Sequence, residues 1–577
     1  MPVRIDLPPP VASPLRHAAD RLIAEVGTPA DDSQATALDV IVDIDATDAA
    51  LGDEGYHLVG TDEAAISVRA STSAGATNGL HALRRRVLVE GRRGTGSLPS
   101  PIDHQVVPGF GRRTVMVAPY PFGGQQGRSV LGADTWGIGR WTEYVEQLRL
   151  LNATGLALFP LRMWHPDFPD TFVEKARYEV WRDVMTLCHD VGLEFHWVML
   201  LNQVPDGFLD ARPDLAVEQN AAWQGTAAAW WKLGNPNELI ALHEPTYEWF
   251  RDADAFAYMW NDGGAADYAP QTLSEPVTPL LELIAFARDR IAAAGSGART
   301  VFWGWLMEPW YPFHAAIHLP NFPALATFHA DALAALPKDM EWLQESARQY
   351  SALGISGYAD PLEAAQDAGF DKLTDFYYLS HPEVAEQIFP RPLLADVRAE
   401  IEHARARGAT GITGYRLSPA SRSVNDAALL RLAEEPDLPP DALLQELAAL
   451  ITGGDAATTP HVVQALTDLD AWRPEVGPPV PGHAGLFLAT IRLDAVTNAT
   501  SPRALRELNA LVRFTALTEI INGAATSPAE RETRFAELLE LCRTEPVLRA
   551  FSSQPQWSSE SNVVLREFVA RLVRPPE

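Results

Sequence analysis

The chain has 577 residues, of which 47% are hydrophobic and 21% are charged, and its formal net charge is −29 at pH 7. This length exceeds that of an ordinary domain and the composition is globular, so we expect roughly two or three domains with cores of their own. The negative charge argues against nucleic acid or an anionic membrane as a partner, because phosphate-binding proteins carry a basic surface.

The cysteine content and the lack of long apolar runs argue against further classes of protein. The two cysteines, Cys188 and Cys542, lie far apart, and no Cys/His spacing is typical of a zinc site. The first residues contain no apolar run of signal-peptide length, and no segment is apolar over the length of a membrane span. We therefore expect a cytoplasmic protein without a disulfide framework or a bound metal.

Residues 1–108 are predicted to form a small α+β domain. Apolar residues at helical spacing alternate here with short runs that have the period of a strand. The predicted elements are a helix over 15–26, strands over 38–44, 55–59 and 65–69, and a helix over 77–86.

Two features lie near the C-terminal end of this predicted domain. The stretch from 92 to 108 is rich in Gly, Pro and Ser, and we interpret it as a linker. Arg84, Arg85 and Arg86 are consecutive in the preceding helix, and we interpret them as a solvated helix face.

From 109 to 420, apolar strands alternate with long amphipathic helices. Parallel strands need such crossovers, so the pattern predicts an α/β fold. Eight strands in about 300 residues fit a (β/α)8 TIM barrel better than an open sheet, although 354–358 competes with the sixth and seventh strands. The predicted strands are 113–119, 154–160, 193–200, 255–260, 299–306, 339–344, 373–379 and 410–416. The helices between them include 141–152, 178–191, 277–294 and 393–407.

Two of these strands lead into a carboxylate among aromatic residues. The fourth ends at Trp260 and is followed by Asn261, Asp262 and two glycines, which permit a tight turn or the close approach of a ligand. The fifth leads to Glu308, which lies between other tryptophans. Glycoside hydrolysis uses a pair of carboxylates on either side of one sugar bond. We therefore hypothesise a glycosidase cleft at the mouth of the barrel.

The remaining strand ends are also polar and aromatic. Catalytic residues of TIM barrels lie at the C-terminal ends of the strands. Aromatic rings stack on the apolar faces of a sugar, while amides and charges bind its hydroxyl groups. We expect substrate binding from Tyr120, Arg162, Trp164, His165, Asn202, Trp260, Trp305, Glu345, Tyr378 and Tyr415.

Three carboxylates are candidates for catalysis. Asp262 is the predicted general acid, whose pKa the aromatic neighbours Tyr258 and Trp260 would raise; its structural alternative is a turn or a helix cap. Glu308 is the predicted second carboxylate, as nucleophile, base or stabiliser, and Glu345 is its rival. Glu308 could instead bind a sugar hydroxyl or form a salt bridge.

Two further regions flank this site in the sequence. The insertion from 205 to 253 contains Trp223, Trp230 and Trp231 and is interpreted as a lid or wall over the mouth. Residues 421–577 are predicted to form an all-helical domain, which allows a homodimer in which it covers the barrel mouth of a partner. The predicted helices are 440–452, 459–472, 485–496, 502–522, 528–542 and 560–573.

The segments GYHLV (55–59), AISV (65–68) and TNGLHAL (77–83) resemble the small α+β domain that precedes the barrel in glycoside hydrolase families 20, 84, 67 and 115. The order of barrel and C-terminal helices is similar to family 84, whose fourth strand ends in two adjacent acids where this chain has Asn261 and Asp262. The resemblance implies an exo-acting glycoside hydrolase, similar to β-N-acetylhexosaminidases, with Asp262 as general acid and Asn261 beside the substrate's N-acetyl group.

Asn261 departs from that family pattern, because an amide cannot stabilise positive charge as a carboxylate does. An inverting enzyme similar to α-glucuronidases is one alternative, and it would need Arg162 or His165 on the sugar carboxylate. A non-catalytic sugar-binding protein is a second alternative, and a scaffold protein built around the C-terminal helices is a third.

Other chemistries have no support in the sequence. No Gly-rich phosphate loop follows a strand, and neither a Gly-x-Ser-x-Gly nor a His-Glu-x-x-His motif occurs. We therefore expect a small-molecule glycoside as the partner and no cofactor.

Overall fold

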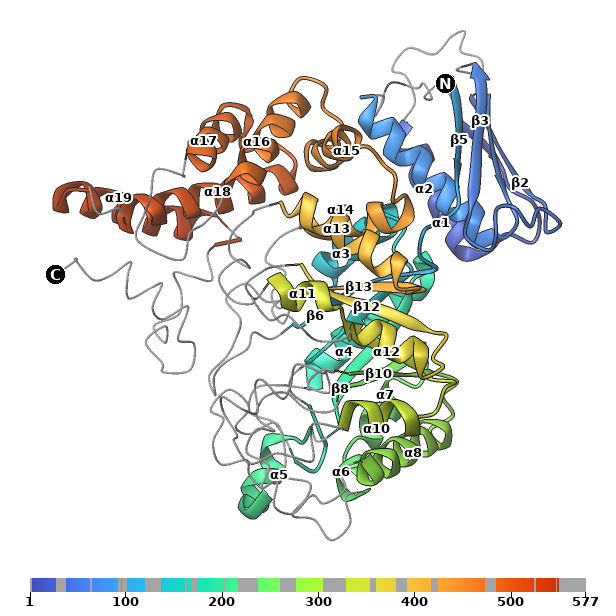
Figure 1. Ribbon diagram of the computed structural model, residues 1–577. Helices are drawn as coiled ribbons and strands as arrows, with labels where there is room; N and C mark the ends of the chain where they lie inside the picture. Colours follow the sequence, from blue (N-terminus) through green and yellow to red (C-terminus); the bar gives the residue numbers. More distant parts are fainter. Residues whose placement is uncertain are drawn as a thin grey trace.

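The computed structural model contains an N-terminal α+β part, a central barrel and a C-terminal group of helices (Figure 1). The residues that it describes are 3–26, 38–62, 65–91, 95, 101–119, 136–160, 163–168, 175–201, 203–215, 237–259, 277–304, 328–352, 360–379, 392–416, 424–472, 484–522, 526–545 and 547–548.

The N-terminal part is a five-stranded mixed sheet in the order β1-β2-β4-β3-β5. Helices α1 and α2 pack against its apolar face and also contact the rest of the molecule, α1 through α4 and α2 through α3 and α15. The predicted α+β fold of this part is therefore confirmed. The elements are β1 (Val3–Asp6), α1 (Ser13–Val26), β2 (Leu38–Ile44), β3 (Tyr56–Asp62), β4 (Ala65–Ala70), α2 (Ser73–Val89) and β5 (Ile102–Val106).

The interpretation of 92–108 as a linker is wrong over 102–106. This segment is β5, and it pairs antiparallel with β3, so that Tyr56 lies opposite Val106. Only Ile102 and Val106 at its two ends are buried, and the three residues between them are polar. The strand lies at the edge of the sheet with little apolar content, so its sequence carries almost no alternation to detect.

The interpretation of the arginine run as a solvated face is wrong for two of its three members. Arg84 and Arg85 are 3% exposed, whereas the side chain of Arg86 is 40% exposed. Arg84 pairs with Glu25 of α1 at 2.7 Å, and Arg85 pairs with Glu434 at 2.9 Å. Their partners come from other helices, one of them about 350 residues further along the chain, and local sequence does not reveal such partners.

The central part is a closed barrel of eight parallel strands, which confirms the predicted (β/α)8 TIM barrel. All eight predicted strands are present, and the barrel closes where β13 pairs with β6. The competing segment 354–358 lies outside the described residues, and the barrel closes without it. The strands are β6 (Arg112–Val117), β7 (Gly155–Leu158), β8 (Glu194–Leu200), β9 (Ala255–Met259), β10 (Arg299–Trp303), β11 (Glu341–Glu345), β12 (Leu373–Tyr378) and β13 (Gly411–Arg416).

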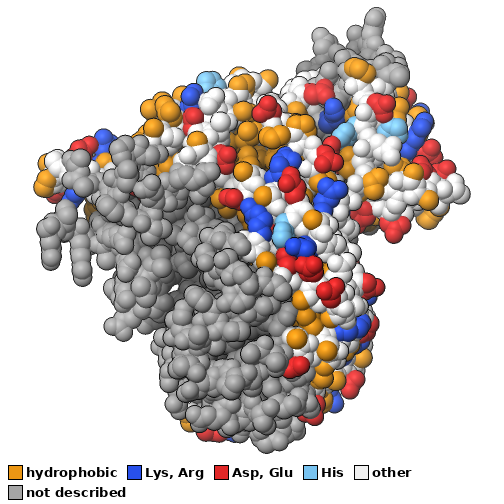
Figure 2. Space-filling view, viewed as in Figure 1, with side chains coloured by type: hydrophobic (Ala, Val, Ile, Leu, Met, Phe, Trp, Pro, Cys, Tyr) orange, Lys and Arg blue, Asp and Glu red, His pale blue; other side chains and the backbone are white. Residues whose placement is uncertain are grey.

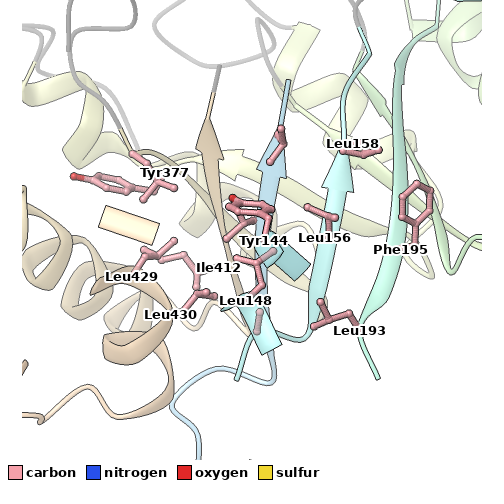
Figure 3. Close-up of a cluster of buried hydrophobic side chains, with 14 of the residues drawn as sticks. Tyr144, Leu148, Leu156, Leu158, Leu193, Phe195, Tyr377, Ile412, Leu429 and Leu430 are labelled. Atoms are coloured by element: carbon pink, nitrogen blue, oxygen red, sulfur yellow. The ribbon is translucent and has the colours of Figure 1, made fainter. Parts of the chain in front are cut away.

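The four predicted barrel helices are confirmed, and outward-facing strand residues pack beneath these and the other barrel helices. Leu156 of β7 and Ile412 of β13 belong to this layer, together with Tyr144 and Leu148 of α3 and Leu429 of α14 (Figure 3). The helices of the barrel part are α3 (Ile138–Leu150), α4 (Lys175–Val191), α5 (Asp206–Ala211), α6 (Asn237–Ala241), α7 (Glu244–Trp249), α8 (Val277–Ala293), α10 (Phe328–Ala335), α11 (Ala347–Ala352), α12 (Pro361–Asp367), α13 (Leu394–Ala406) and α14 (Val424–Glu434).

Helices alone follow the barrel in the described part of the chain, as predicted. Prolines stand in the first turns of α15, α16 and α19, where the missing N–H costs no helical hydrogen bond. The first helix after the last strand, α14, packs on β6 and β13 and therefore covers the barrel. The remaining helices are α15 (Pro440–Thr452), α16 (Thr459–Ala471), α17 (Ala484–Val496), α18 (Arg503–Asn522) and α19 (Pro528–Thr544). The helix predicted over 560–573 lies outside the described residues.

Acidic and basic side chains are interspersed over the described part of the surface in Figure 2. Among the described residues, no helix combines the length and the apolar content that a membrane crossing requires. The insertion predicted to cover the mouth contributes α5, α6 and α7, but Trp223, Trp230 and Trp231 lie outside the described residues.

Candidate active site

The inner face of the barrel is lined by alternate residues of its strands. A buried cluster contains these inward side chains, which are mostly small or aliphatic on β6 to β9 and larger on β10 to β13. Four aromatic rings belong to the cluster: Phe159, Trp303, Phe376 and Tyr415. Because all eight strands are parallel, these residues near the C-terminal strand ends share one end of the barrel.

The four rings form one connected layer. The ring centroids of Trp303 and Phe376 are 4.4 Å apart, and those of Phe376 and Tyr415 are 5.1 Å apart. Phe159 meets Trp303 edge-on at 5.6 Å. Edge-to-face and tilted contacts at these distances are favourable, so the layer is a firm floor beneath the mouth.

Glu345 is the carboxylate that the structure brings to this floor. It is the last residue of β11, lies opposite Phe376 of β12 in the register and is 0% exposed. Nε1 of Trp303 donates a hydrogen bond to it at 3.2 Å, and Nε2 of Gln344 donates another at 3.2 Å. Both donors hold the carboxylate in a fixed orientation on the inner side of the barrel.

Gly304 makes this arrangement sterically possible. Its N–H donates to the carbonyl of Leu343 at 2.8 Å, which extends the pairing of β10 with β11 beyond Trp303. A Cβ at this position would lie 2.0 Å from Oε1 of Gln344 and 2.7 Å from the ring of Trp342. Only glycine therefore allows the strand end to approach the amide that supports Glu345.

Of the other predicted site residues in the described part of the chain, Tyr415 lies in the aromatic floor and is 2% exposed. Tyr378 ends β12, opposite Tyr415 in the register. His165 is buried, its Nδ1 accepts from the N–H of Asp167 at 3.1 Å, and burial lowers the pKa of its imidazole. His165 is therefore a neutral hydrogen-bonding group at pH 7.

Trp164 packs in the outer layer. Its ring lies 5.8 Å from that of Tyr178 of α4 and 5.7 Å from that of Trp249 of α7. Its backbone N–H also donates to the hydroxyl of Tyr178 at 3.2 Å. These contacts show that Trp164 belongs to the packing between the helices and the strands.

The expectation that Tyr258 lines the barrel mouth is wrong. Tyr258 faces the helices, and its hydroxyl donates to that of Tyr247 in α7 at 2.8 Å. Met259, the next residue, is the one that points into the barrel. The alternation of side chains along β9 therefore places Tyr258 on the wrong side of the sheet for a role in the mouth.

The other predicted site residues lie outside the described residues, although several follow described strand ends directly in the sequence. Asn261 and Asp262 follow β9, which ends at Met259, and Glu308 follows β10, which ends at Trp303. Residues of this group are Tyr120, Arg162, Asn202, Trp260, Asn261, Asp262, Trp305 and Glu308.

Phe159 and Phe376 are members of the floor that the sequence did not single out. The run from Phe376 to Tyr378 contains three consecutive aromatic residues, and only the register of β12 decides which of them points inward. Aromatic residues at alternate positions near a strand end are the signal that would have found them.

The opposite end of the barrel is closed by an ionic network. Glu194 accepts from both terminal nitrogens of Arg299 at 2.8 Å, and Arg112 lies 2.8 Å from Glu341. Burial raises the pKa of Glu194, but the hydrogen bonds from His196 and Arg299 outweigh it and lower that pKa. Here the charges are paired, and a cavity of about 330 Å³ beside Arg299 and Glu341 lies at the other end of the barrel from Glu345.

Among the described residues, no group of three or more His, Cys, Asp or Glu side chains is arranged to hold a metal ion.

Comparisons by sequence and by structure give different results. No family model matches the chain, and no curated protein is similar to it in sequence. Solved structures, however, match along almost all of its length. The chain shares its fold with glycoside hydrolases. This confirms the predicted resemblance at the level of the fold, which is as far as such low identities reach.

Three of these structures belong to three different families. A family GH115 4-O-methyl-α-glucuronidase with specificity for decorated arabinogalactans has a TM-score of 0.59 at 10% identity, over 100% of this chain and 79% of its own. A GH138 enzyme targeting pectin rhamnogalacturonan II has a TM-score of 0.56 at 10% identity, over 95% and 73%. The protein CpGH84B has a TM-score of 0.52 at 12% identity, over 99% and 96%.

Proposed function

We propose that the protein is an exo-acting glycoside hydrolase that removes a terminal sugar from a small glycoside or oligosaccharide. The observation that carries this proposal is Glu345, a buried carboxylate held over an aromatic floor at the C-terminal end of a closed parallel barrel. A carboxylate beside apolar rings suits a sugar, whose ring has apolar faces and whose transition state for hydrolysis carries positive charge.

The proposed mechanism uses two carboxyl groups. Asp262, as general acid, protonates the glycosidic oxygen, so that the bond to the leaving group breaks and positive charge develops on the sugar ring. The second carboxylate then either attacks the anomeric carbon, which forms a glycosyl-enzyme that water hydrolyses, or takes a proton from the water that attacks this carbon. Glu345 and Glu308 are the candidates for this role, and the hydrogen bond from Trp303 supports Glu345. A separation from Asp262 of about 5–5.5 Å would give retention, and about 6.5–9.5 Å would give inversion.

The first test measures turnover of a panel of aryl glycosides by the purified wild type and by Glu345→Gln and Glu308→Gln. One of the two variants should have a kcat lower by about 10²–10⁴-fold, and the glutamate replaced in it is the second carboxylate. The other variant should keep most of its activity. Glu341→Gln is the control for Glu345→Gln, because Glu341 is a buried glutamate on the inner face of the same strand at its opposite end.

Two results would count against the proposal. If the wild type releases no phenol from any glycoside of the panel but binds the sugars, the protein is a sugar-binding protein on this fold. If Glu345→Gln and Glu308→Gln both turn over at the wild-type rate, neither glutamate is the second carboxylate.

The role of Asp262 is tested with leaving groups of different acidity. Asp262→Asn should lower turnover far more for an alkyl glycoside than for a nitrophenyl glycoside, because an activated phenol leaves without help from an acid. Equal losses for both substrates would show that Asp262 is not the general acid. The aryl glycoside panel would still test whether the protein is a glycosidase.

Two arms of the panel distinguish the sugar classes. One neighbour in fold is a 4-O-methyl-α-glucuronidase, so an aryl α-glucuronide belongs beside an aryl β-N-acetylhexosaminide. Because the imidazole of His165 is neutral at pH 7, recognition of a uronic acid would fall to Arg162. Loss of glucuronide turnover in Arg162→Lys, with other glycosides unaffected, would identify the uronic acid as the substrate.

A further inference from the structure

A group of buried acids lies behind the floor, on the helix side of the barrel. Asp375 is the third residue of β12 and is followed by the inward-facing Phe376, so it faces the helices. Glu400 belongs to α13, and both carboxyl groups are 0% exposed. Asp360, at the start of α12, is the third acid of the group and is 5% exposed.

Two of the three acids lie beside a basic side chain and accept hydrogen bonds. Glu400 accepts from Nη1 of Arg348 at 2.9 Å and from the hydroxyl of Ser346. Asp360 lies 2.6 Å from Nε2 of His403, and its other oxygen accepts from the N–H of Leu362. The guanidinium of Arg407 lies 3.5 Å from Asp360 and supplies a positive charge there.

Asp375 has no such basic partner in the part of the chain that the structure describes. Neither of its oxygens accepts a hydrogen bond from any donor in the described part of the chain. Burial raises the pKa of Asp375, and the negative charges of Glu400, Asp360 and Glu345 raise it further. An isolated buried carboxylate costs several kcal/mol or more, so the group is neutral instead. A neutral carboxylic acid has one proton to donate, and the acceptor that faces it is Glu400.

The next residues connect this pair to the proposed active site. Ser346, which hydrogen-bonds to Glu400, directly follows Glu345 in the sequence. Gln349 of α11 donates to the backbone carbonyl of Phe376 and so fixes this helix to the end of β12. The segment that follows β11 is thereby held at two points, one of which depends on Glu400.

We propose that Asp375 is a positioning residue of the active site: it is a neutral acid whose proton bridges to Glu400 and thereby, through Ser346, fixes Glu345. The positioning role rests on the proposed function, whereas the bridging proton does not. The bridged pair carries one negative charge, which the single positive charge of Arg348 balances. Hydrogen bonds from a neutral acid to a carboxylate are short and strong, so the pair gives α13 and the strand end one fixed arrangement.

The bridging proton is tested by stability against pH. In the unfolded chain Asp375 loses its proton near pH 4, whereas the folded protein keeps it. Stability therefore falls as pH rises above that value, and the unfolding constant increases by about tenfold per pH unit from this group. Asp375→Asn lacks this proton, and all other titrating groups, Glu345, Asp360, Glu400 and His403 included, are common to both proteins.

The expected result is that the ratio of the two unfolding constants, wild type over Asp375→Asn, rises by about 100-fold between pH 5 and pH 7 in denaturant titrations. Asp371→Asn is the control, because Asp371 is an exposed aspartate just before the same strand. Its ratio to wild type should not change over this range. A constant ratio for Asp375→Asn would show that Asp375 is ionised in the folded protein, and it would overturn the proposal.

The positioning role is tested by turnover. Asp375→Asn keeps a donor to Glu400 and should retain kcat within a few-fold, whereas Asp375→Leu has no donor and should lose at least about tenfold in kcat with KM little changed. Ser346→Ala removes the hydrogen bond that connects Glu400 to the strand end and keeps both Asp375 and Glu400, so it serves if the leucine variant does not fold.

Wild-type kcat in Ser346→Ala, or an equal loss in Asp375→Asn and Asp375→Leu, would overturn the positioning role. If the wild type cleaves no glycoside, the proposed function fails, while the unfolding constants still decide where the proton is.

Discussion

Trp303 and Trp342 lie on adjacent strands, and their side chains point to opposite sides of the barrel wall. Trp303 points inward, contacts Phe376 and donates to Glu345. Trp342 points outward and packs against Phe302. Both are at most 2% exposed, so burial alone does not distinguish them, and only the side of the sheet assigns one to the site and the other to packing.

We predict that Trp303→Phe lowers kcat by about 10–100-fold, because a hydrogen bond to a charged group contributes about 1.5–3 kcal/mol. Phenylalanine keeps an aromatic ring against Phe376 and removes the indole N–H together with part of the ring system. Trp342→Phe, measured in the same steady-state assay, should leave kcat unchanged and lower the melting temperature through the lost packing. Equal kcat values for the two variants would mean that the indole of Trp303 does not support the catalytic carboxylate.

Helix α2 shows how an element can be fixed by contacts that its own sequence does not favour. Gly79 stands in the middle of the helix, where glycine is about 1 kcal/mol less favourable than alanine. A Cβ there would lie 2.5 Å from Cγ1 of Val68 and 3.2 Å from Cβ of Tyr56. The glycine therefore lets the helix approach the sheet closely.

Gly79→Ala is expected to destabilise the protein by about 1–3 kcal/mol in spite of the better helix propensity, because Val68 and Tyr56 cannot move aside freely. Gly139→Ala in α3 is the matched control, since no atom lies within 4 Å of a Cβ at that position. This change should be neutral or stabilise by up to about 1 kcal/mol. Denaturant titration of both variants measures the difference, and a stabilising Gly79→Ala would refute the close-packing argument.

At the scale of the whole molecule, one buried carboxylate joins the N-terminal part to the barrel. Glu434 ends α14 and accepts from the hydroxyl of Tyr56 at 2.8 Å, from Arg85 at 2.9 Å and from Asn152 at 2.6 Å. Burial raises the pKa of Glu434, but Arg85 and Arg431 outweigh burial and lower that pKa to about 2. The N-terminal sheet, its helix and the barrel are thus connected through one charge.

Glu434→Gln should destabilise the protein at pH 7 by about 3–5 kcal/mol, because it leaves buried arginines without their counter-charge. The lowered pKa means that this stabilisation is present above about pH 4.5 and is lost as pH falls toward 2, so the wild type should lose stability over that range and the variant much less. Glu435→Gln, at a partly exposed neighbour, should cost less than about 1 kcal/mol.

The sequence-based predictions failed where the surroundings of a residue are set by segments that are distant in the chain or by the side of the sheet. The Arg84 and Arg85 side chains have the pattern of a solvated face, but α1, α14 and α15 bring acids to them. The polar sequence of β5 hides a strand because its partner, β3, supplies the pairing. Tyr258 lies close to the predicted acid in sequence, but its side chain faces the helices and contacts Tyr247.

The sequence by itself determined the eight barrel strands, their order and the helices after the barrel, because apolar period and turn chemistry are local properties that each segment carries. It also identified Glu345 and Tyr415 as residues at strand ends. Only the tertiary structure decided which aromatic rings form the floor, that Glu345 receives the indole N–H, and that Asp375 and Glu400 are buried. These depend on strand register and on charges brought together from distant segments, and neither is encoded in the spacing of residues along one segment.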